Sequence, residues 1–556
     1  MPLRNNLQKR TKYIFVSGGV ISGIGKGTTA ASIALLLKSA GFTVAPIKFE
    51  GYLNIDAGTI NPVEHGDPFL CEDGTEGDMD IGTYEKFLNE DMGRDNFVTM
   101  GQIYKTIIEK ERRFEYNGED VEAVHISKEI ITRIQKIAEN KDADIVTIEL
   151  GGTAGEYWNV FFYEASRLLA LQNPGDVIHI HVSYMPTPNH LGEPKTKPTQ
   201  LSVRTLNSLG IQPDFIIARS EKPLDQRRID RLALFCNMQP EAIISNPDLD
   251  SVYEIPMVLH QQELDKKILQ KLNLPVKKTN LKEWEELVEK IKKPKNKQIE
   301  IAIIGKYFGT GDYQLKDSYA ALFDAIDHAA WQLGINAKTK WVDSEKIEKG
   351  NPEKLIGNSD GIIVPIGWGE RGAEGMIKAA DYARVKNIPY LGLCYGMQLA
   401  VVSFARNVLG WKDANTTENN PKSTHPVVYL IPTQKEIMER RAYGGTMRLG
   451  AWDATVAKNT KAYKLYEKYN DFIDKNKNLI SERHRHRYEF NNTYAQEFES
   501  KGLIISSRSV NENLVEIIEV PDHPFYIGTQ GHPEYKSRPL KPHPIFLGFI
   551  QACSKK

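Results

Sequence analysis

Short apolar runs rich in isoleucine and valine alternate with amphipathic segments, and this pattern constrains the fold most strongly. In the first half, the runs at 13–19, 144–152, 176–184 and 214–220 each lead into a turn, and segments of helical periodicity such as 28–41 lie between them. Buried strands that alternate with helices form a parallel sheet with helices on both faces. The sequence therefore predicts a doubly wound α/β domain.

The alternation starts again in the second half, at 300–307, 361–367 and 388–394. We therefore expect two doubly wound α/β domains, at 1–275 and 299–556, each of ordinary domain size.

The stretch 276–298 between these two domains is polar and ends in the breaker-containing run KKPKNK. Its apolar residues have the spacing of one helix face; they are Trp284, Leu287, Val288 and Ile291. We expect this stretch to be a linker that contains an amphipathic helix.

Composition excludes several classes of protein. Apolar residues make up 41% of the 556 residues and the formal net charge is −1, so no overall field attracts nucleic acid or an anionic membrane. The four cysteines are far apart and form no CxxC pair. The basic start lacks the long apolar stretch of a secretory signal, and no run approaches the length of a membrane span. We expect a cytoplasmic protein with no nucleic-acid or membrane partner.

The stretch 392–398, GLCYGMQ, places Cys394 between two glycines after an apolar run and before a helix-compatible segment. This is the G-x-nucleophile-x-G spacing of a nucleophile elbow, in which a sharp strand-to-helix turn requires small neighbours. The positive end of the helix dipole favours a thiolate there. The alternative, a cysteine that only fills the core, does not account for this spacing.

A nucleophilic thiol needs a base, and the base needs an orienting group. His532 and Glu534 are two residues apart in TQGHPEYKSRP (529–539), so on an extended segment they would point the same way. The expected oxyanion donors are the backbone NH of Tyr395 and an NH of the glycine turn 365–372.

With these motifs, the second half resembles a class I (triad) glutamine amidotransferase. In that family the cysteine attacks the side-chain amide of glutamine, ammonia leaves and water hydrolyses the thioester. The resemblance implies Cys394 as nucleophile, His532 as base and Glu534 as the residue that orients the base.

In the first half, SGGVISGIGKGTT (17–29) follows the first strand and opens a helix. Backbone NH groups of such a loop cradle phosphates, and Lys26 would reach the terminal ones. The spacing is one residue longer than a strict Walker A motif, and Gly27 replaces the usual hydroxyl residue. Magnesium must therefore find oxygen ligands elsewhere, and carboxylates suit it: five acidic residues lie within 72–80, and Glu149 ends an apolar strand. A solvated charged face would explain several of these acidic residues, but it explains Glu149 less well.

A third segment, 192–214, contains the run KTKPTQ (195–200), whose ammonium, hydroxyl and amide groups suit a triphosphate and a base edge. A solvated basic loop would look similar.

Together these features resemble the CTP synthase family, in order along nearly the whole chain. The matching motifs include YIFVSGGVISGIGKG, NIDAGTINPVEHGDPF, EDGTEGDMDIGTYEKF, ELGGTAGE, GEPKTKPTQ, GERGAEGM, GLCYGMQ and ERHRHRYEFN. The implied fold is an N-terminal P-loop-type synthetase domain followed by the amidotransferase domain. The implied reaction is ATP-dependent amination of UTP to CTP, with ammonia from glutamine.

The resemblance also implies binding residues. ATP would be held by Gly23, Ile24, Gly25, Lys26, Gly27, Thr28 and Asp80, and Mg2+ by Asp80 and Glu149. UTP or CTP would be held by Ser22, Lys195, Thr196, Lys197, Pro198, Thr199, Gln200 and Arg231. Glutamine would be held by Gly367, Tyr395, Gly396, Met397, Gln398, Glu418 and Arg485.

Further implications of the resemblance concern regulation and assembly. Lys48 would lie near the phosphates, His65 would line an ammonia passage, and Arg371 matches a position linked to activation by GTP. The family works as a homotetramer, so self-association is expected.

Some positions depart from the family pattern. Glu156 and Trp158 stand where most members carry an aspartate and a glutamate that bind cytidine in product inhibition. An indole cannot accept a hydrogen bond from a cytosine amine, so we expect weakened CTP feedback. Gly531 replaces the phenylalanine of QFHPE, and GTGDYQ (309–314) resembles an insertion in the GTP-responsive lid.

Two other functions remain open at this level. One is a glutamine-dependent ligase that acts on a related pyrimidine nucleotide. The other is a catalytically silent, filament-forming homologue, which predicts loss of chemical groups that this sequence retains.

Overall fold

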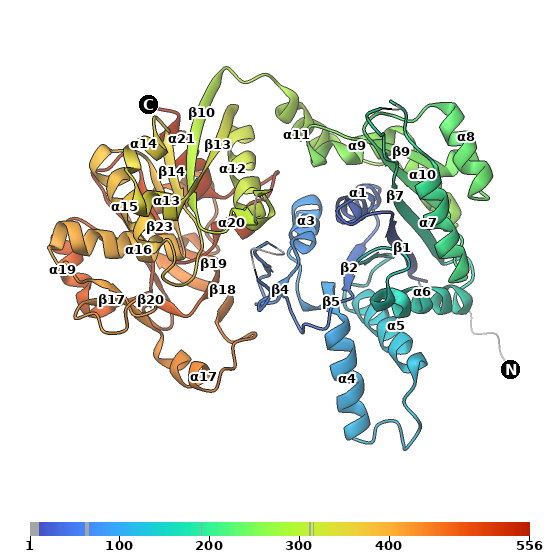
Figure 1. The fold of residues 1–556 in the computed structure, drawn as a ribbon, viewed down its shortest axis with the longest axis horizontal. Helices are drawn as coiled ribbons and strands as arrows, with labels where there is room; N and C mark the ends of the chain where they lie inside the picture. The colour runs from blue at the N-terminus through green and yellow to red at the C-terminus, as the bar shows by residue number, and fades with distance from the viewer. Residues whose placement is uncertain (1–9, 62–65, 191, 311–312, 315, 556) are drawn as a thin grey trace. The chain divides into compact units, whose positions relative to one another are not determined.

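The computed structural model describes residues 10–61, 66–190, 192–310, 313–314 and 316–555. The chain divides into two compact units (Figure 1). Unit 1 comprises 1–55 and 80–289, and unit 2 comprises 56–79 and 290–556. Residues 56–79, which we expected in the first domain, thus group with the second.

Unit 1 is built on a seven-stranded, all-parallel sheet in the order β5-β2-β6-β1-β7-β8-β9. The strands are β5 (Phe97–Thr99), β2 (Val44–Glu50), β6 (Ile145–Leu150), β1 (Lys12–Gly19), β7 (Val177–Tyr184), β8 (Phe215–Ser220) and β9 (Ile243–Pro247). The four strands predicted from sequence in this half are confirmed. Central β1 is buried along its whole length, as expected for a parallel strand with both faces covered.

Helices cover this sheet. Helix α1 (Lys26–Ser39) follows β1 directly, and α7 (Lys197–Ser208) and α8 (Gln226–Phe235) flank β7 and β8 in sequence. Figure 1 shows α4 (Met100–Arg112) and α5 (Ala123–Asn140) as a neighbouring pair. Strands β2, β5 and β6 lie on one side of β1, and β7, β8 and β9 lie on the other. The strand order therefore reverses at β1, and open α/β sheets bind ligands at such a point.

The amphipathic stretch between the halves forms helix α11 (Lys282–Lys292), as predicted. Trp284 packs against Phe87 and Tyr253, with ring centroids 5.2 and 5.9 Å away, and its indole NH donates to the Tyr253 carbonyl at 2.8 Å. The start of this helix is therefore part of the core of unit 1 rather than a free linker.

Unit 2 contains a nine-stranded sheet in the order β13-β10-β14-β15-β23-β22-β21-β18-β19. The first five strands are parallel: β13 (Ile335–Asp343), β10 (Lys297–Gly305), β14 (Gly361–Val364), β15 (Tyr390–Leu393) and β23 (Tyr526–Thr529). An antiparallel extension follows, with β22 (Val515–Glu519), β21 (Ile504–Ser509), β18 (Arg448–Val456) and β19 (Leu479–His486). Helices α12 (Ala320–Leu333), α15 (Ala373–Lys386), α16 (Tyr395–Phe404) and α21 (Pro544–Cys553) pack on it.

Residues 56–79 contain a small antiparallel hairpin of β3 (Phe69–Leu70) and β4 (Glu76–Gly77). Within unit 2 the hairpin lies against the backbone of β18: Ala451 NH donates to the Glu72 carbonyl at 2.8 Å. A Cβ on Gly450 would lie 2.6 Å from the backbone nitrogen of Gly74, so only glycine permits this approach. We refer to 56–79 as the hairpin segment.

In the part of the chain that the structure describes, no helix is long and apolar enough to cross a membrane.

Candidate active sites

Cys394 occupies the turn between β15 and α16 with φ 51° and ψ −100°, a backbone conformation that is unusual for a residue with a side chain. The flanking glycines are required by close packing, since a Cβ on Gly396 would lie 1.9 Å from the Val364 carbonyl oxygen. One on Gly392 would lie 2.8 Å from the backbone of Gly396. This strained strand-to-helix turn has the geometry of a nucleophile elbow.

His532 and Glu534 form a buried pair in which imidazole Nδ1 lies 2.7 Å from Glu534 Oε1. Glu534 lies in the short helix α20 (Pro533–Lys536) that begins directly after His532, so the pairing does not arise from an extended segment as we expected. His532 Nε2 is buried and meets no strong acceptor among the described residues, which leaves it available for the proton of a thiol.

The charges around His532 favour the imidazolium form. Burial alone would lower its pKa, but the negative charges of Glu534 and Cys394 outweigh burial and raise the pKa to about 10. A thiolate next to an imidazolium is the activated state of a cysteine nucleophile.

Several residues predicted to hold glutamine are linked to Tyr395, which directly follows Cys394. Glu418 Oε1 accepts a hydrogen bond from Gly369 NH at 2.8 Å, and the Tyr395 hydroxyl donates to the Gly369 carbonyl at 2.8 Å. Gly367 lies beneath Tyr395, since an added Cβ would approach the Tyr395 ring to 3.0 Å. Met397 packs under β23, where a Cβ on Gly528 would lie 2.9 Å from its Cγ.

Gln398 reaches the nucleophile through a second glutamine that sequence reasoning missed. Its amide nitrogen donates to Tyr488 O at 2.8 Å and to Gln530 Oε1 at 3.2 Å. Gln530 Nε2 in turn donates to Cys394 Sγ at 3.5 Å. The position of Gln530, two residues before His532, was the available signal.

Arg485 turns only its backbone toward the nucleophile, with Cys394 Sγ 3.8 Å from its carbonyl oxygen. Its side chain enters the hairpin segment, where Nε donates to Glu76 Oε1 at 2.6 Å and Nη1 lies 3.5 Å from Asp67 Oδ1. Asp67 and Glu76 lie within motifs of the family resemblance, but the sequence indicates a contact with Arg485 for neither, and it marks Glu76 only as one of several acidic residues near the magnesium site.

In unit 1 the phosphate-loop residues lie between β1 and α1. Gly23 and Gly25 adopt φ of 70° and 83°, which exposes backbone NH groups at the helix start as an anion cradle requires. The Lys26 stem passes over Gly18, where a Cβ would lie 2.4 Å from its Cδ. Ile24 is buried, whereas Ser22 is exposed and Thr28 half-buried.

Gly27 is needed because Asp80 lies directly over it: an added Cβ would be 2.1 Å from Asp80 Oδ1. Asp80, at the start of α3 (Met79–Leu88), and Glu149, at the end of β6, both bind the buried ammonium of Lys48, the latter at 3.2 Å. The loop and both carboxylates therefore meet at the carboxyl edge of the sheet, as sequence predicted.

The two carboxylates fit a divalent cation. Burial and the charge of Asp80 raise the pKa of Glu149 to about 7, whereas attraction to Lys48 outweighs burial and lowers the pKa of Asp80. Among the described residues, no three acidic, histidine or cysteine side chains converge as a complete metal site. Two carboxylates whose charges repel suit a magnesium ion that phosphate oxygens also bind.

A basic pocket of about 460 Å3 gathers part of the predicted UTP set. Its lining includes Lys195, Thr196, Lys197 and Arg231, together with the unpredicted Glu193, Pro194, Arg227 and Arg228. Arg228 binds Glu193 at 2.5 Å. The run QRRIDR (226–231) was the available signal for the added arginines.

The remaining predicted residues of this set do not line the pocket. Pro198 lies in the first turn of α7, Thr199 hydrogen-bonds to the Ser183 hydroxyl at 2.9 Å, and Gln200 donates to the Thr196 hydroxyl at 3.0 Å. Ser22 lies in the phosphate loop. His65 falls outside the described residues.

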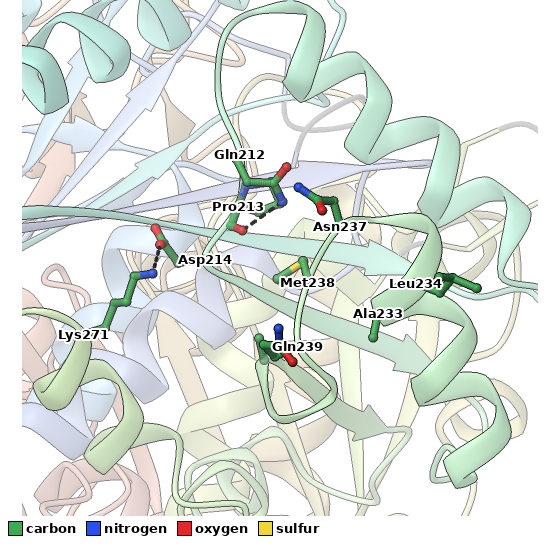
Figure 2. Close-up of a pocket in the computed structure, with 10 residues that line it drawn as sticks. Gln212, Pro213, Asp214, Ala233, Leu234, Asn237, Met238, Gln239 and Lys271 are labelled. Carbon is green, nitrogen blue, oxygen red and sulfur yellow. Dashed lines mark hydrogen bonds and ion pairs between the residues drawn. The ribbon is translucent and has the colours of Figure 1, made fainter.

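A different pocket of about 430 Å3 contains none of the predicted residues (Figure 2). Figure 2 shows the amides of Gln212, Asn237 and Gln239 around it and the ion pair of Asp214 with Lys271, which is 3.0 Å long. Asp214 directly precedes β8, so this pocket lies at the amino end of that strand. Ligands of parallel sheets bind at the carboxyl ends, which separates this pocket from the nucleotide site.

Comparison with known proteins identifies a family match in each half of the chain. Residues 12–274 match the family described as CTP synthase N-terminus, and residues 314–552 match glutamine amidotransferase class-I. A CTP synthase of Caldanaerobacter subterraneus is 48% identical over 97% of this chain and 98% of its own length. A CTP synthase of Pyrococcus furiosus is 46% identical over 98% of both chains.

The chain belongs to the CTP synthase family. The recognition and the two α/β domains expected from sequence are confirmed. Among solved structures, the glutaminase domain of Trypanosoma brucei CTPS with bound acivicin is 37% identical and covers 46% of this chain and 94% of its own, with a TM-score of 0.41.

Proposed function

We propose a division of labour for the reaction of this CTP synthase family member, a ligase that aminates UTP to CTP with ATP and with nitrogen from glutamine. Unit 2 would release ammonia from glutamine, and unit 1 would use it. The alternative functions, a ligase for a related pyrimidine nucleotide and a silent homologue, are disfavoured by the full-length similarity and by the presence of both the buried His532–Glu534 pair and the cysteine elbow.

On the glutamine side, the Cys394 thiolate attacks the side-chain amide carbon. The His532 imidazolium gives its proton to the departing nitrogen, so ammonia leaves and a thioester remains. His532 then takes a proton from water as the water attacks the thioester, and glutamate and thiolate are released. Glu534 holds the imidazole through Nδ1 throughout.

Glutamine would be oriented by Gly367, Glu418, the backbone of Arg485 and the segment 395–398. The half-buried carboxylate of Glu418 suits the α-ammonium group of an amino acid. Backbone NH groups of Tyr395 and of the turn after β14 are the candidate oxyanion donors.

On the nucleotide side, ATP phosphorylates O4 of the uracil ring, and ammonia then displaces phosphate at C4. Lys26, Lys48 and the backbone of 23–28 would bind the phosphates of ATP, and positioning with charge neutralisation supplies most of the catalysis in phosphoryl transfer. Asp80 and Glu149 would hold Mg2+, which neutralises phosphate charge when bound. The basic pocket beside α7 and α8 would bind the triphosphate of UTP.

Assembly and regulation are part of the proposal. Leu234 and Phe235 of α8 are exposed apolar side chains, which supports burial in a homotetramer. GTP activation would involve Arg371, whose guanidinium binds Glu345 at 2.5 Å and the Lys306 carbonyl at 2.6 Å. A cytoplasmic location suits a reduced nucleophile and nucleotide substrates.

The observation that carries this proposal is the His532–Glu534 pair beside a cysteine on a strained elbow. The test is full-length Cys394→Ala, with Cys553→Ala as the matched control. We expect Cys394→Ala to lose glutamine-dependent CTP formation and to keep the rate with free ammonia, while Cys553→Ala keeps both. Glutamine hydrolysis by Cys394→Ala would overturn the assignment.

A further inference from the structure

Two acidic side chains of the hairpin segment pack against β19 and against α20, the short helix that begins directly after His532. Asp67 is 7% exposed and Glu76 is 2% exposed, and both contact Arg485. Arg483 of β19 donates to Leu70 O at 2.9 Å and to Tyr535 O at 3.2 Å, which ties the hairpin to α20. Buried charges of this kind need a specific partner, and each of these has one in unit 2.

A chain of two contacts leads from this segment to the base. The Tyr535 hydroxyl donates to Asp67 Oδ2 at 2.7 Å. The Tyr535 ring stacks on the His532 imidazole, with centroids 5.2 Å apart and an angle of 25° between the ring planes. Phe69 meets Tyr535 edge-on, with centroids 5.3 Å apart and an angle of 74°. The phenol is therefore held between the hairpin and the imidazole.

The contact also has an electrostatic component. The titratable groups that interact with Asp67 include Arg485, Tyr535, His532 and Glu534, together with Glu76, Tyr307 and Tyr319. Burial raises the pKa of Asp67, although the charge of Arg485, the hydrogen bond from Tyr535 and the smaller contribution of His532 act to lower it. Because the interaction with His532 is mutual, the negative charge of Asp67 stabilises the imidazolium. A phenol that donates to a carboxylate also presents a more electron-rich ring to the stacked cation.

We propose that Asp67 and Tyr535 are positioning residues for the base of glutamine hydrolysis: their hydrogen bond fixes the ring on which His532 stacks. This inference rests on the proposed role of His532. It assigns to the hairpin segment, near the start of the chain, a part in a reaction carried out by groups at 394–534. Neither residue belongs to the set assigned to glutamine, and both act through His532.

The test uses the full-length variants Tyr535→Phe and Asp67→Asn in steady-state glutamine hydrolysis. Each change keeps the shape of the side chain: Tyr535→Phe removes the hydroxyl donor, and Asp67→Asn removes the carboxylate acceptor with its negative charge. We expect kcat to fall about tenfold while KM stays within about twofold, because the base is misplaced while every residue assigned to glutamine is kept. The alkaline limb of the rate should move to lower pH, since the imidazolium loses support. CTP formation from free ammonia should stay within about twofold of the wild-type rate.

Tyr526→Phe is the matched control, because its buried hydroxyl donates to Ala380 O at 3.3 Å and not to the hairpin. It should leave kcat and the pH profile unchanged. The double variant Tyr535→Phe/Asp67→Asn should be no worse than either single one, since both remove the same interaction.

Two results would overturn the inference: wild-type kcat and pH limb in Tyr535→Phe, or losses in the double variant that equal the product of the single losses. If Asp67→Asn does not fold, Tyr535→Phe decides alone. Failure of the underlying assignment is distinguishable, because His532→Ala would then still hydrolyse glutamine.

Discussion

Arg485 donates a 2.6 Å hydrogen bond from Nε to Glu76, a residue 409 positions earlier in the chain. Both side chains are almost completely buried. Removing one partner of a buried ion pair leaves an uncompensated charge, so we expect Glu76→Ala to destabilise unit 2 by about 3 kcal/mol. Chemical denaturation of the full-length protein measures this loss.

The control for that variant is Glu111→Ala. Glu111 also binds an arginine, Arg112 at 2.6 Å, but both side chains are exposed. Exposed pairs contribute little, so its denaturation midpoint should not move. Equal destabilisation by the two variants would show that the buried Glu76 pair stabilises the protein no more than an exposed pair does.

Gly27→Ala tests the close approach of Asp80 to the phosphate loop. The added methyl would lie 2.1 Å from Asp80 Oδ1, so the carboxylate must move away from its position over the loop. We expect CTP formation to fall about a hundredfold with either nitrogen source, while basal glutamine hydrolysis persists. Gly444→Ala, whose methyl would meet Thr59 Cγ2 at 3.6 Å, should have wild-type rates. Unchanged synthesis in Gly27→Ala would argue against a role for Asp80 at the nucleotide.

The pH dependence of glutamine hydrolysis follows from His532. Its pKa in the folded protein is about 10, above the ordinary value near 6.5, so the proton stays on the ring below that pH. The ion pair and its stabilisation are fully present below about pH 6.5 and disappear as pH rises through about 10. Initial rates should be flat between about pH 7 and 9 and fall above about pH 10.

Glu534→Gln provides the comparison for this profile. It removes the carboxylate that supports the imidazolium, so the falling limb should begin at lower pH. If the rate falls at the same pH in the wild type and in Glu534→Gln, a group other than His532 controls that fall.

Trp158 lines a pocket at the position that the family resemblance relates to inhibition by the product CTP. A pocket of about 380 Å3 is lined by Glu50, Gly51, Tyr52, Leu53, Gly152, Glu156, Trp158 and Asn159. The Glu156 carboxylate already accepts hydrogen bonds from Thr153 NH and hydroxyl, at 2.8 and 2.6 Å, and Trp158 offers no acceptor. We expect weak inhibition by CTP in steady-state assays, and stronger inhibition of Trp158→Glu.

The neighbouring Tyr157 is 94% exposed and does not line this pocket, so Tyr157→Glu serves as the control for added charge. Inhibition of the wild type as strong as that of Trp158→Glu would contradict this expectation.

Most of the individual chemical groups could be predicted because their signals are local. The elbow around Cys394, the phosphate loop around Lys26 and the pair His532–Glu534 each lie within a few residues of sequence. The reason expected for that last pair was wrong, because Glu534 lies in a helical turn. Local spacing thus predicted the two partners correctly, but it did not predict the backbone conformation that brings them together.

The groups that sequence reasoning missed are joined by long-range contacts. Gln530 links Gln398 to Cys394 by hydrogen bonds. Arg227 and Arg228 of α8 line the same pocket as Lys195 and Lys197. The antiparallel extension of the second sheet was likewise missed, since its strands pair through separate loops.

By itself, the sequence determined the two α/β series, the elbow around Cys394 and the glycine-rich loop before Lys26, because alternating hydrophobicity and glycine spacing act over short distances along the chain. Only the tertiary structure decided that residues 56–79 pack with the second unit and that Asp67 reaches Tyr535. These two side chains are 468 positions apart in the chain, and no local pattern encodes a buried hydrogen bond between groups so distant in sequence.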